Sequence, residues 1–306
     1  MTQEPAEAAP RPGVAETLAP GLVRVLAPNP SPMTLHGTNS YLLGETRLAV
    51  IDPGPADPLH LDALLAAIGG RPVSAIVVTH SHVDHSPLAR PLARATGAPV
   101  LAFGDSAAGR SPVMQRLAAQ GLAGGGEGVD PDFAPDETLS DGQILADDDW
   151  SLEALHTPGH MGNHLCLLWD RTLFSGDLVM GWASSLVSPP DGDLTDFMAS
   201  LDRLSALDLT TCQSGHGAPI PDPQARIDWL RRHRLSREAQ VLEALTPGPA
   251  DLPTLTARVY TDIPPAMHPA AARNLLAHLV DLFGRGLVTA TPHLAQDARF
   301  ALARTP

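Results

Sequence analysis

The sequence contains no lysine: all 20 of its basic residues are arginine. This absence excludes Schiff-base chemistry at a lysine and the lysine of a phosphate-binding P-loop. Cysteine is scarce as well, because Cys166 and Cys212 are the only two in 306 residues. Two cysteines cannot make a disulfide framework, so we expect a reducing, cytoplasmic compartment. No apolar run approaches the roughly 18 residues of a membrane span and the first residues carry no hydrophobic signal core, so we expect no membrane partner.

Positive charge is in short supply, because 20 arginines stand against 34 acidic residues and give a formal net charge of −14. The deficit of positive charge belongs to residues 1–221, which contain 10 arginines and 26 acidic residues. Residues 222–306 contain 10 arginines and 8 acidic residues. An acidic body argues against a strongly basic nucleic-acid-binding protein. Two compositions in a chain of this length predict two domains. We expect a flexible N-terminal arm over 1–20, a first domain over 21–221 and a second over 222–306.

The first domain is predicted to consist of short apolar strands separated by helices and turns. One batch of strands falls within residues 22–103 and another within 144–214, with a Gly-, Pro- and Asp-rich stretch at 104–136 between them. Two batches of strands, each with helices alongside, favour two packed sheets covered by helices over one doubly wound parallel sheet. The stretch at 104–136 is expected to be either a mobile insertion near a site or plain surface.

The second domain has a different outline. Helical patterns cover residues 224–246, 252–260 and 270–283, and a small hairpin is predicted between Leu287 and Leu302. Three helices followed by a hairpin are typical of a winged-helix-like domain.

Three of the 13 histidines lie within six residues. They belong to the segment T-H-S-H-V-D-H, which follows a predicted buried strand and therefore forms the loop at the end of that strand. His80 and His82 are two residues apart and can point the same way, toward one cation. Asp84 and His85 come after a turn and can face a second cation. Imidazole and carboxylate groups suit borderline cations such as zinc, so we predict a metal site rather than a polar loop that caps the next helix.

Four further ligand-type residues stand at predicted strand ends beside glycine or proline. His160 follows Thr-Pro-Gly, Asp177 follows Ser-Gly and His216 lies between two glycines. Asp52 precedes Pro-Gly. Taken singly, each is more typical of turn chemistry than of a ligand. Together with the first cluster they complete two coordination spheres, with Asp52 either a turn former or a carboxylate that orients a metal-bound histidine.

These segments in this order, T-H-S-H-V-D-H followed by P-G-H, S-G-D and G-H-G, resemble the metallo-β-lactamase superfamily. The run N-P-S-P-M-T-L-H-G-T-N-S-Y-L at 29–42 resembles the opening of the β-lactamase-like protein 2 group within it. The fold that the resemblance implies is of the α/β (α+β) class, a four-layer αββα sandwich followed by a small winged-helix-like C-terminal domain. The resemblance covers nearly the whole chain after the arm.

The resemblance also implies an activity, that of a dinuclear metal-dependent hydrolase in which a metal-bridging hydroxide is the nucleophile. The two divalent ions are expected to be Zn2+, and Mn2+ or Fe2+ would fit the same ligands. By the same resemblance the first ion is held by His80, His82 and His160, the second by Asp84, His85 and His216, and Asp177 bridges the two.

Other residues near these segments have two interpretations each. Asp84 could orient the attacking water, and His164 could be a general acid for the leaving group or a packed histidine of the following strand. Asn39 could donate to a substrate oxygen or cap its own turn, and His36 could line the cleft or lie on a surface loop. Asp84 and His164 are therefore candidate catalytic residues, and Asn39 and His36 are candidate substrate contacts.

The substrate is not decided by the ligands, because the same hydroxide attacks a phosphorus or a carbonyl centre. The resembling group includes a metal-dependent endoribonuclease, which implies cleavage of single-stranded RNA, but the acidic body repels a polyanion. The alternatives are a small-molecule acyl hydrolase, acting on a thioester or lactone, and a non-catalytic binding module stabilised by metal. An arginine cluster at 231–237 could guide a phosphate chain, although an exposed helix face is favoured. The oligomeric state is not predicted.

Overall fold

The computed structural model describes residues 10–124, 128–261 and 263–303. Its first sheet has seven strands, hydrogen-bonded in chain order. They are β1 (Ala15–Ala19), β2 (Leu22–Leu26), β3 (Asn39–Leu43), β4 (Leu48–Ile51), β5 (Val73–Val77), β6 (Val100–Ala102) and β7 (Glu137–Thr138). The second sheet has five strands in the order β12-β11-β10-β9-β8. They are β8 (Ile144–Asp147), β9 (Trp150–His156), β10 (Leu165–Trp169), β11 (Thr172–Gly176) and β12 (Thr211–Ser214).

The two sheets pack face to face. Side chains such as Ile51 and Val77 from the first sheet meet Leu152, Leu165 and Phe174 from the second in one buried cluster. Alternate residues of each strand point to the opposite face, where helices cover them. This arrangement leaves the carboxyl ends of several strands together at one edge of the sandwich.

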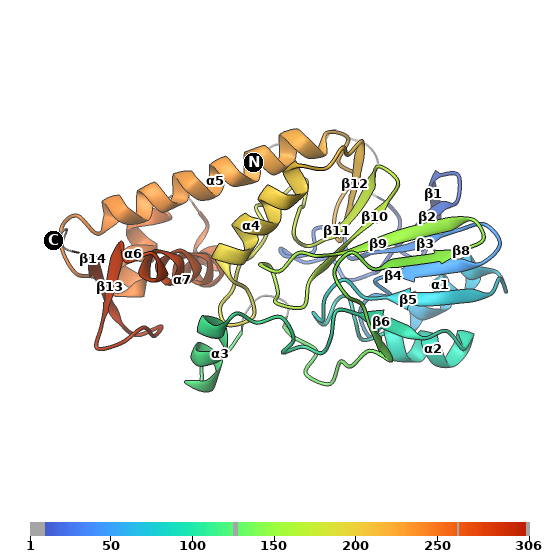
Figure 1. The fold of residues 1–306 in the computed structure, drawn as a ribbon, viewed down its shortest axis with the longest axis horizontal. Helices are drawn as coiled ribbons and strands as arrows, with labels where there is room; N and C mark the ends of the chain where they lie inside the picture. The colour runs from blue at the N-terminus through green and yellow to red at the C-terminus, as the bar shows by residue number, and fades with distance from the viewer. Residues whose placement is uncertain (1–9, 125–127, 262, 304–306) are drawn as a thin grey trace.

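Helices cover both outer faces, as Figure 1 shows. The first sheet packs against α1 (Pro58–Ile68) and α2 (Ala89–Thr96) through residues such as Leu64 and Leu92. The second packs against α4 (Leu194–Ser205) and the long α5 (Pro223–Ala244) through Phe197, Ile227 and Leu230. The predicted four-layer αββα sandwich is therefore confirmed.

Aspartate caps begin four of the helices. The side chains of Asp57, Asp193, Asp222 and Asp251 each accept a hydrogen bond from a backbone N–H in the first turn of α1, α4, α5 and α6 (Leu252–Val259) respectively. Such caps satisfy donors that the helix itself leaves unpaired. Each of these helix starts is therefore set locally by the sequence.

The C-terminal part forms a separate cluster, at the left of Figure 1. The helix α7 (His268–Gly284), preceded by a short 3-10 turn at Pro265–Met267, packs against α5 and α6, and the hairpin of β13 (Val288–Thr291) and β14 (Arg299–Leu302) closes the unit. This is the predicted winged-helix outline. The helix α3 (Pro112–Ala119) lies within the Gly-, Pro- and Asp-rich stretch at 104–136. It adds Met114 and Leu117 to the same cluster.

The N-terminal prediction needs a correction. Residues Ala15–Ala19, predicted as part of the arm over 1–20, form β1 and pair antiparallel with β2. An ion pair of 2.6 Å between Glu16 and Arg24 joins the two strands. Residues 1–9 of the arm lie outside the described residues. The domain boundary at 221/222 stays a prediction.

No helix in the described part of the chain combines the length and the apolar character that crossing a bilayer requires.

Candidate metal centre

The predicted ligands come together at the edge of the sandwich where strands end. His80 lies just after β5, Asp177 after β11 and His216 after β12, while His160 stands in the loop between β9 and β10. All seven predicted ligand side chains are buried. Two groups of side chains offer converging ligand atoms. The first consists of His80, His82, His160 and Asp177, and the second of Asp84, His85 and His216.

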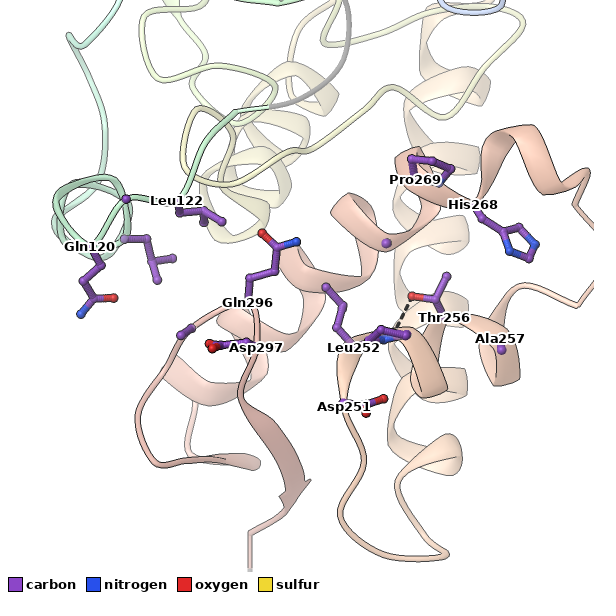
Figure 2. Close-up of a pocket in the computed structure, with 15 residues that line it drawn as sticks. Gln120, Leu122, Asp251, Leu252, Thr256, Ala257, His268, Pro269, Gln296 and Asp297 are labelled. Atoms are coloured by element: carbon purple, nitrogen blue, oxygen red, sulfur yellow. Dashed lines mark hydrogen bonds between the residues drawn. The ribbon is translucent and has the colours of Figure 1, made fainter.

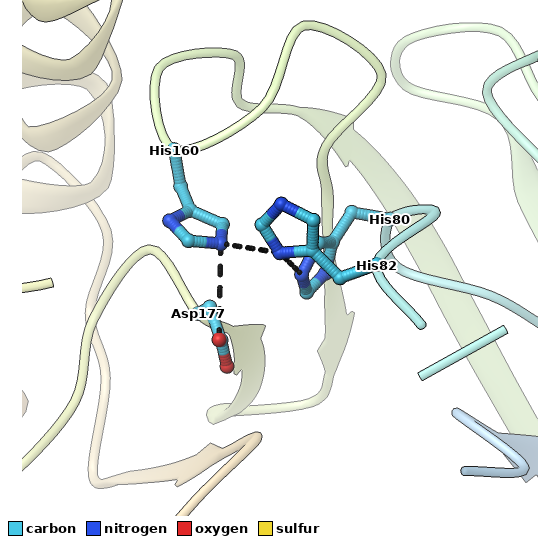
Figure 3. Close-up of side chains that lie close together, drawn as sticks. All are labelled: His80, His82, His160 and Asp177. Carbon is cyan, nitrogen blue, oxygen red and sulfur yellow. Dashed lines mark hydrogen bonds and ion pairs between the residues drawn. The ribbon is translucent and has the colours of Figure 1, made fainter. Parts of the chain in front are cut away.

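The first group is built around His82, as Figure 3 shows. Its Nδ1 atom lies 3.0 Å from Nε2 of His80 and 3.1 Å from Nε2 of His160. Nε2 of His160 is in turn 3.7 Å from a carboxylate oxygen of Asp177. Ligand nitrogens around a tetrahedral zinc ion with bonds of about 2.0–2.1 Å lie roughly 3.3–3.4 Å apart. The observed spacings are therefore close to those of a coordination sphere.

The second group shares Asp177 with the first. Nε2 of His216 lies 3.2 Å from Oδ2 of Asp84 and 3.2 Å from Oδ2 of Asp177. Nε2 of His85 lies 3.4 Å from Asp84 and 3.5 Å from Oδ1 of Asp177. The Asp177 carboxylate thus stands between the two groups, the position that a bridging ligand requires.

Hydrogen bonds on the outer side fix how four of the histidine rings are turned. Nδ1 of His160 is 2.6 Å from the Leu186 carbonyl and Nδ1 of His216 is 3.1 Å from the Gly37 carbonyl. A carbonyl can only accept, so both rings carry a proton on Nδ1 and turn Nε2 toward the site. These contacts are of the kind that orients histidine ligands in metal sites.

Asp52 plays the same part for the other two rings. Its Oδ2 lies 2.9 Å from Nδ1 of His85 and accepts from the Thr79 hydroxyl at 2.7 Å. The Thr79 oxygen, having donated its proton, accepts from Nδ1 of His80 at 3.0 Å. Asp52 therefore lies behind one histidine of each group, where an orienting carboxylate would stand.

Burial keeps the three histidines of the first group neutral. Removal from water disfavours the imidazolium form and, with the nearby His160, lowers the pKa of His82 to about 3. The pKa values of His80 and His160 are lowered by burial as well. Neutral imidazole is the form that coordinates a metal ion.

The second group behaves in the opposite way. Burial disfavours the charged form, but the carboxylates of Asp177 and Asp84 outweigh it and raise the pKa of His216 to about 10. The same carboxylates raise the pKa of His85 well above its usual range. In return, the pKa values of Asp84 and Asp177 stay well below their usual range despite burial. A cation would replace these two protons as the charge that neutralises the carboxylates.

Several buried ligand atoms have no hydrogen-bond partner within the described residues. They include Oδ1 of Asp84, Nε2 of His85 and Oδ1 of Asp177. Leaving buried polar atoms unpaired costs about 1–3 kcal/mol each, more when they are charged. Ligand atoms without partners that converge from two loops fit a divalent cation, so the donor set suits the predicted ions.

The structure puts the remaining candidates in different surroundings. His164 is fully buried behind Asp177, with Nε2 3.3 Å from the Asp177 backbone nitrogen. Asn39 is buried and its amide donates to the carbonyls of Ser214 and Gly217, so it holds the loop that carries His216. His36 is partly exposed beside Gly37. Their catalytic and substrate-binding roles stay predictions.

Some contributors escaped the sequence-based predictions. The Thr38 hydroxyl donates to Oδ2 of Asp84 at 3.2 Å. Thr38 lies in the family-like run at 29–42, which was a usable signal. The Leu186 carbonyl that orients His160 had none, because a backbone atom leaves no mark on residue type.

Two cavities are lined in part by residues of α3 or of the segments that flank it. The larger, of about 830 Å³, is walled by the end of α3 and by α6 and α7 (Figure 2). The smaller, of about 600 Å³, is lined by residues that include Arg110, Val129 and Asp191. Its lining residue Val129 forms an isolated β-bridge with the backbone of His82.

The sequence matches the family model of the metallo-beta-lactamase superfamily over residues 33–216. Residues 252–295 match the beta-lactamase associated winged helix domain. Among known proteins, a beta-lactamase-like protein 2 homolog of Caenorhabditis elegans is 30% identical over 288 residues, which cover 91% of this chain and 89% of the relative. An atrochrysone carboxyl ACP thioesterase of Aspergillus fumigatus is 31% identical over 238 residues, which cover 75% of this chain and 66% of the relative.

Solved structures agree with this assignment. A metallo-beta-lactamase family protein from Thermus thermophilus is 26% identical and superimposes with a TM-score of 0.75, covering 94% of this chain and all of its own. A beta-lactamase domain protein from Burkholderia ambifaria shares the fold with a TM-score of 0.76 at 22% identity, covering 97% of this chain and 96% of its own. The predicted resemblance is therefore confirmed, and the chain belongs to the metallo-beta-lactamase superfamily of hydrolases, with a winged-helix domain at its C-terminal end.

Proposed function

We propose that this protein is a dinuclear metal-dependent hydrolase of small-molecule acyl substrates, with a thioester as the leading candidate. The observation that carries the metal part is the pair of adjoining His/Asp groups with Asp177 between them and unpaired acceptors on both sides. His80, His82 and His160 would hold one ion, and Asp84, His85 and His216 the other. Zn2+ is the expected metal, with Mn2+ or Fe2+ as alternatives.

Two divalent cations in these positions would lower the pKa of a shared water and stabilise negative charge that develops on the substrate. The chain's own residues prepare the site for them. Asp52, Thr79, Leu186 and Gly37 hold the rings of four histidines by their outer nitrogens. Asp84 belongs to the second group, and its Oδ1, which has no hydrogen-bond partner among the described residues, could hold a water while the other oxygen holds an ion.

The charge on the protein supports an acyl substrate over RNA. The net charge of −14 disfavours a polyanion. The arginine cluster on α5 is largely engaged within the protein: Arg231 pairs with Asp202 at 2.6 Å, Arg234 is buried, and Arg237 donates to the Val259 carbonyl. Arginines used in this way offer little to a phosphate chain.

The smaller cavity supports the same conclusion. Arg110, the arginine that lines this cavity, pairs with the Asp191 carboxylate at 2.6 Å. The lining also carries the carboxylate of Asp105, so none of its described residues offers an unpaired positive group. Such a cavity suits an uncharged acyl group better than a row of phosphates. Relatives named atrochrysone carboxyl ACP thioesterases, which share 75% of this chain's length, also support thioester hydrolysis.

Phosphodiester cleavage of single-stranded RNA is the second candidate. The observation that favours it is the whole-length similarity to the beta-lactamase-like protein 2 homologs, a group that the sequence resemblance links to an endoribonuclease. The two candidates use the same metal groups and differ in what the cavity accepts.

A paired turnover assay on protein of measured metal content separates them. One arm uses an acyl thioester and a lactone panel, the other bis(p-nitrophenyl) phosphate and a single-stranded RNA oligonucleotide. We expect turnover in the acyl arm, with about two divalent ions per chain. His82→Ala should abolish turnover and lower metal content, while His293→Ala, on the surface of the C-terminal hairpin loop, should change neither. Cleavage in the phosphate arm alone would mean that the substrate is RNA and not a thioester. Full activity of His82→Ala would contradict the metal assignment.

A further inference from the structure

A short segment between β11 and α4, residues 184–187, determines how His160 is turned. The Leu186 carbonyl in its middle accepts the Nδ1–H of His160 at 2.6 Å. Because this bond leaves only Nε2 to face the site, the place of the Leu186 carbonyl decides where the His160 lone pair points. The segment lies in a loop of the first domain, where the Ser185 hydroxyl donates to the Leu178 carbonyl at 3.1 Å. Its other side-chain hydrogen bonds, among the described residues, come from the C-terminal helices.

Arg234 of α5 holds the first half of the segment. Its Nη2 donates to the carbonyls of Ser184 at 2.8 Å and Ser185 at 2.7 Å. The side chain is only 3% exposed, and its guanidinium carbon lies 5.0 Å from the centre of the Phe197 ring on α4. Arg234 therefore connects α4 and α5 to the segment that precedes Leu186.

Asn274 of α7 holds the second half. Its Oδ1 accepts from the backbone N–H of Val187 at 3.0 Å and from Nη1 of Arg234 at 3.0 Å. The residues on both sides of Leu186 are thus fixed by two side chains that also bond to each other. A short connection held at both ends has little freedom to move its central carbonyl.

We propose that Arg234 and Asn274 are positioning residues for His160, and that the C-terminal helices α5 and α7 thereby shape the first metal group. The link to metal binding rests on the proposed function, whereas the link to the His160 ring does not. The C-terminal helices then have a part in the hydrolytic site itself, besides whatever the winged-helix domain binds.

The chemistry of Arg234 favours this role over a general stabilising one. The partners recorded for its terminal nitrogens are neutral, two carbonyls and an amide oxygen, in the part of the chain that the structure describes. Burial lowers the pKa of this guanidinium to about 10, which shows how strongly its surroundings disfavour the charge. A buried cation paired only with neutral acceptors is a costly way to fill space, and its directional donors are what it adds over an apolar side chain.

Substitutions at the two positions separate geometry from packing. Asn274→Ala removes the acceptor for Val187 and Arg234, whereas Asn274→Asp keeps it. Arg234→Met removes the hydrogen-bond donors and keeps much of the side-chain volume. Arg234→Lys restores a positively charged donor group on a single nitrogen. Arg237→Met is the matched control, because Arg237 is also an α5 arginine that stacks on an aromatic ring and bonds a carbonyl, but those partners are Tyr260 and Val259 of the C-terminal domain.

The first measurement needs no metal. In metal-free protein labelled with 15N-histidine, long-range ring couplings report which nitrogen of His160 carries the proton, with His160→Gln used to assign the signal. We expect the Nδ1–H tautomer with slow exchange in the wild type, in Asn274→Asp and in Arg237→Met. In Asn274→Ala and Arg234→Met we expect mixed tautomers and at least about tenfold faster exchange, with partial recovery in Arg234→Lys.

The second measurement is Zn2+ affinity by competition with a chelator. Asn274→Ala should weaken the site of His80, His82 and His160 by about 10–100-fold, the usual effect of losing a group that orients a ligand, and leave the other site within about twofold. Asn274→Ala with the wild-type tautomer, exchange rate and Zn2+ affinity would overturn the proposal. If Arg234→Met fails to fold, the comparison of Asn274→Ala with Asn274→Asp still tests the proposal. A wild type that shows the expected tautomer but binds no Zn2+ would refute the proposed function and leave the positioning of the ring established.

Discussion

The Nε2 atom of His164 accepts a hydrogen bond from the backbone N–H of Asp177 at 3.3 Å. On the other side of the ring, Nδ1 lies 3.1 Å from the Thr157 hydroxyl, which donates its own proton to Cys166. The ring is fully buried, and burial together with nearby His160 keeps its pKa well below the usual range. His164 is thus a neutral link between the end of β9 and the turn that presents Asp177.

His164→Ala tests whether this link or proton donation is its function. From the contacts we expect lower metal affinity, because the turn bearing Asp177 loses its support, and equal slowing of thioesters with good and poor leaving groups. The measurements are metal content and kcat/KM across a series of leaving-group thiols. Unchanged metal content with slowing confined to poor leaving groups would instead support the predicted general acid.

Asp52→Asn tests the carboxylate that holds His85. Asp52 has a φ of 50°, a left-handed conformation that asparagine adopts readily, so the substitution removes charge with little backbone strain. The amide keeps an acceptor for Thr79 but no longer stabilises a positive charge near His85. We expect roughly 10–100-fold weaker metal binding, measured by chelator competition. Asp57→Asn, at the partly buried N-cap of α1, should bind metal as the wild type does. Equal affinity in both variants would show that the Asp52 charge has no part in the site.

Gly159→Ala tests why glycine precedes His160. Gly159 has a φ of 142°, and a Cβ at this position would overlap the backbone of Phe197. Either α4 or the loop must move, and we expect a loss of about 2–4 kcal/mol in the free energy of unfolding together with reduced metal content. Gly70→Ala is the control, because Gly70 also has a positive φ, of 76°, but a Cβ there would meet nothing within 4 Å. A cost for Gly159→Ala no larger than for Gly70→Ala would mean that α4 yields easily.

Local sequence identified the strands and the candidate ligands at their ends, whereas the division of those ligands between two ions came from the family resemblance. Strand-end residues such as His80 and Asp177 could be grouped because an apolar strand followed by a ligand-type side chain is a short-range pattern. The four-layer fold followed from the spacing of those strands and from the family resemblance. Strand β1 was missed because Ala15–Ala19 contains alanine and glutamate, which are uncommon in strands. It is an edge strand, and its pairing with β2 is a tertiary contact that local sequence does not show.

What escaped prediction around the site is long-range in sequence. Arg234 and Asn274 stand 49 and 87 residues from the backbone groups of Ser185 and Val187 that they bond. The arginine cluster on α5 was favoured as an exposed face, yet the structure turns Arg234 inward to a carbonyl-lined position that no helical periodicity revealed. Side chains that act on backbone atoms of distant loops leave no pattern in a single sequence.

His60 gives the protein a predictable response to acid. The ring is buried on α1, with Nε2 2.9 Å from the Ser40 hydroxyl, and Nδ1 has no hydrogen-bond partner in the part of the chain that the structure describes. Burial lowers its pKa from 6.5 to about 4, although Asp57 acts in the opposite direction. Between these two values the unfolded chain binds a proton at this position and the folded chain does not. The stability that His60 contributes is therefore complete above pH 6.5 and is lost as the pH falls toward 4.

We expect His60→Gln to reduce the pH dependence of stability within that window. One group can contribute a slope of at most about 1.4 kcal/mol per pH unit, so the variant's loss of stability on acidification should be smaller than the wild type's by up to this slope. Urea unfolding at a series of pH values, on metal-free protein of both forms, measures it. His293→Gln, on an exposed turn, should follow the wild type. Parallel curves for wild type and His60→Gln would mean that the buried ring takes up its proton in the folded state as easily as in the unfolded chain.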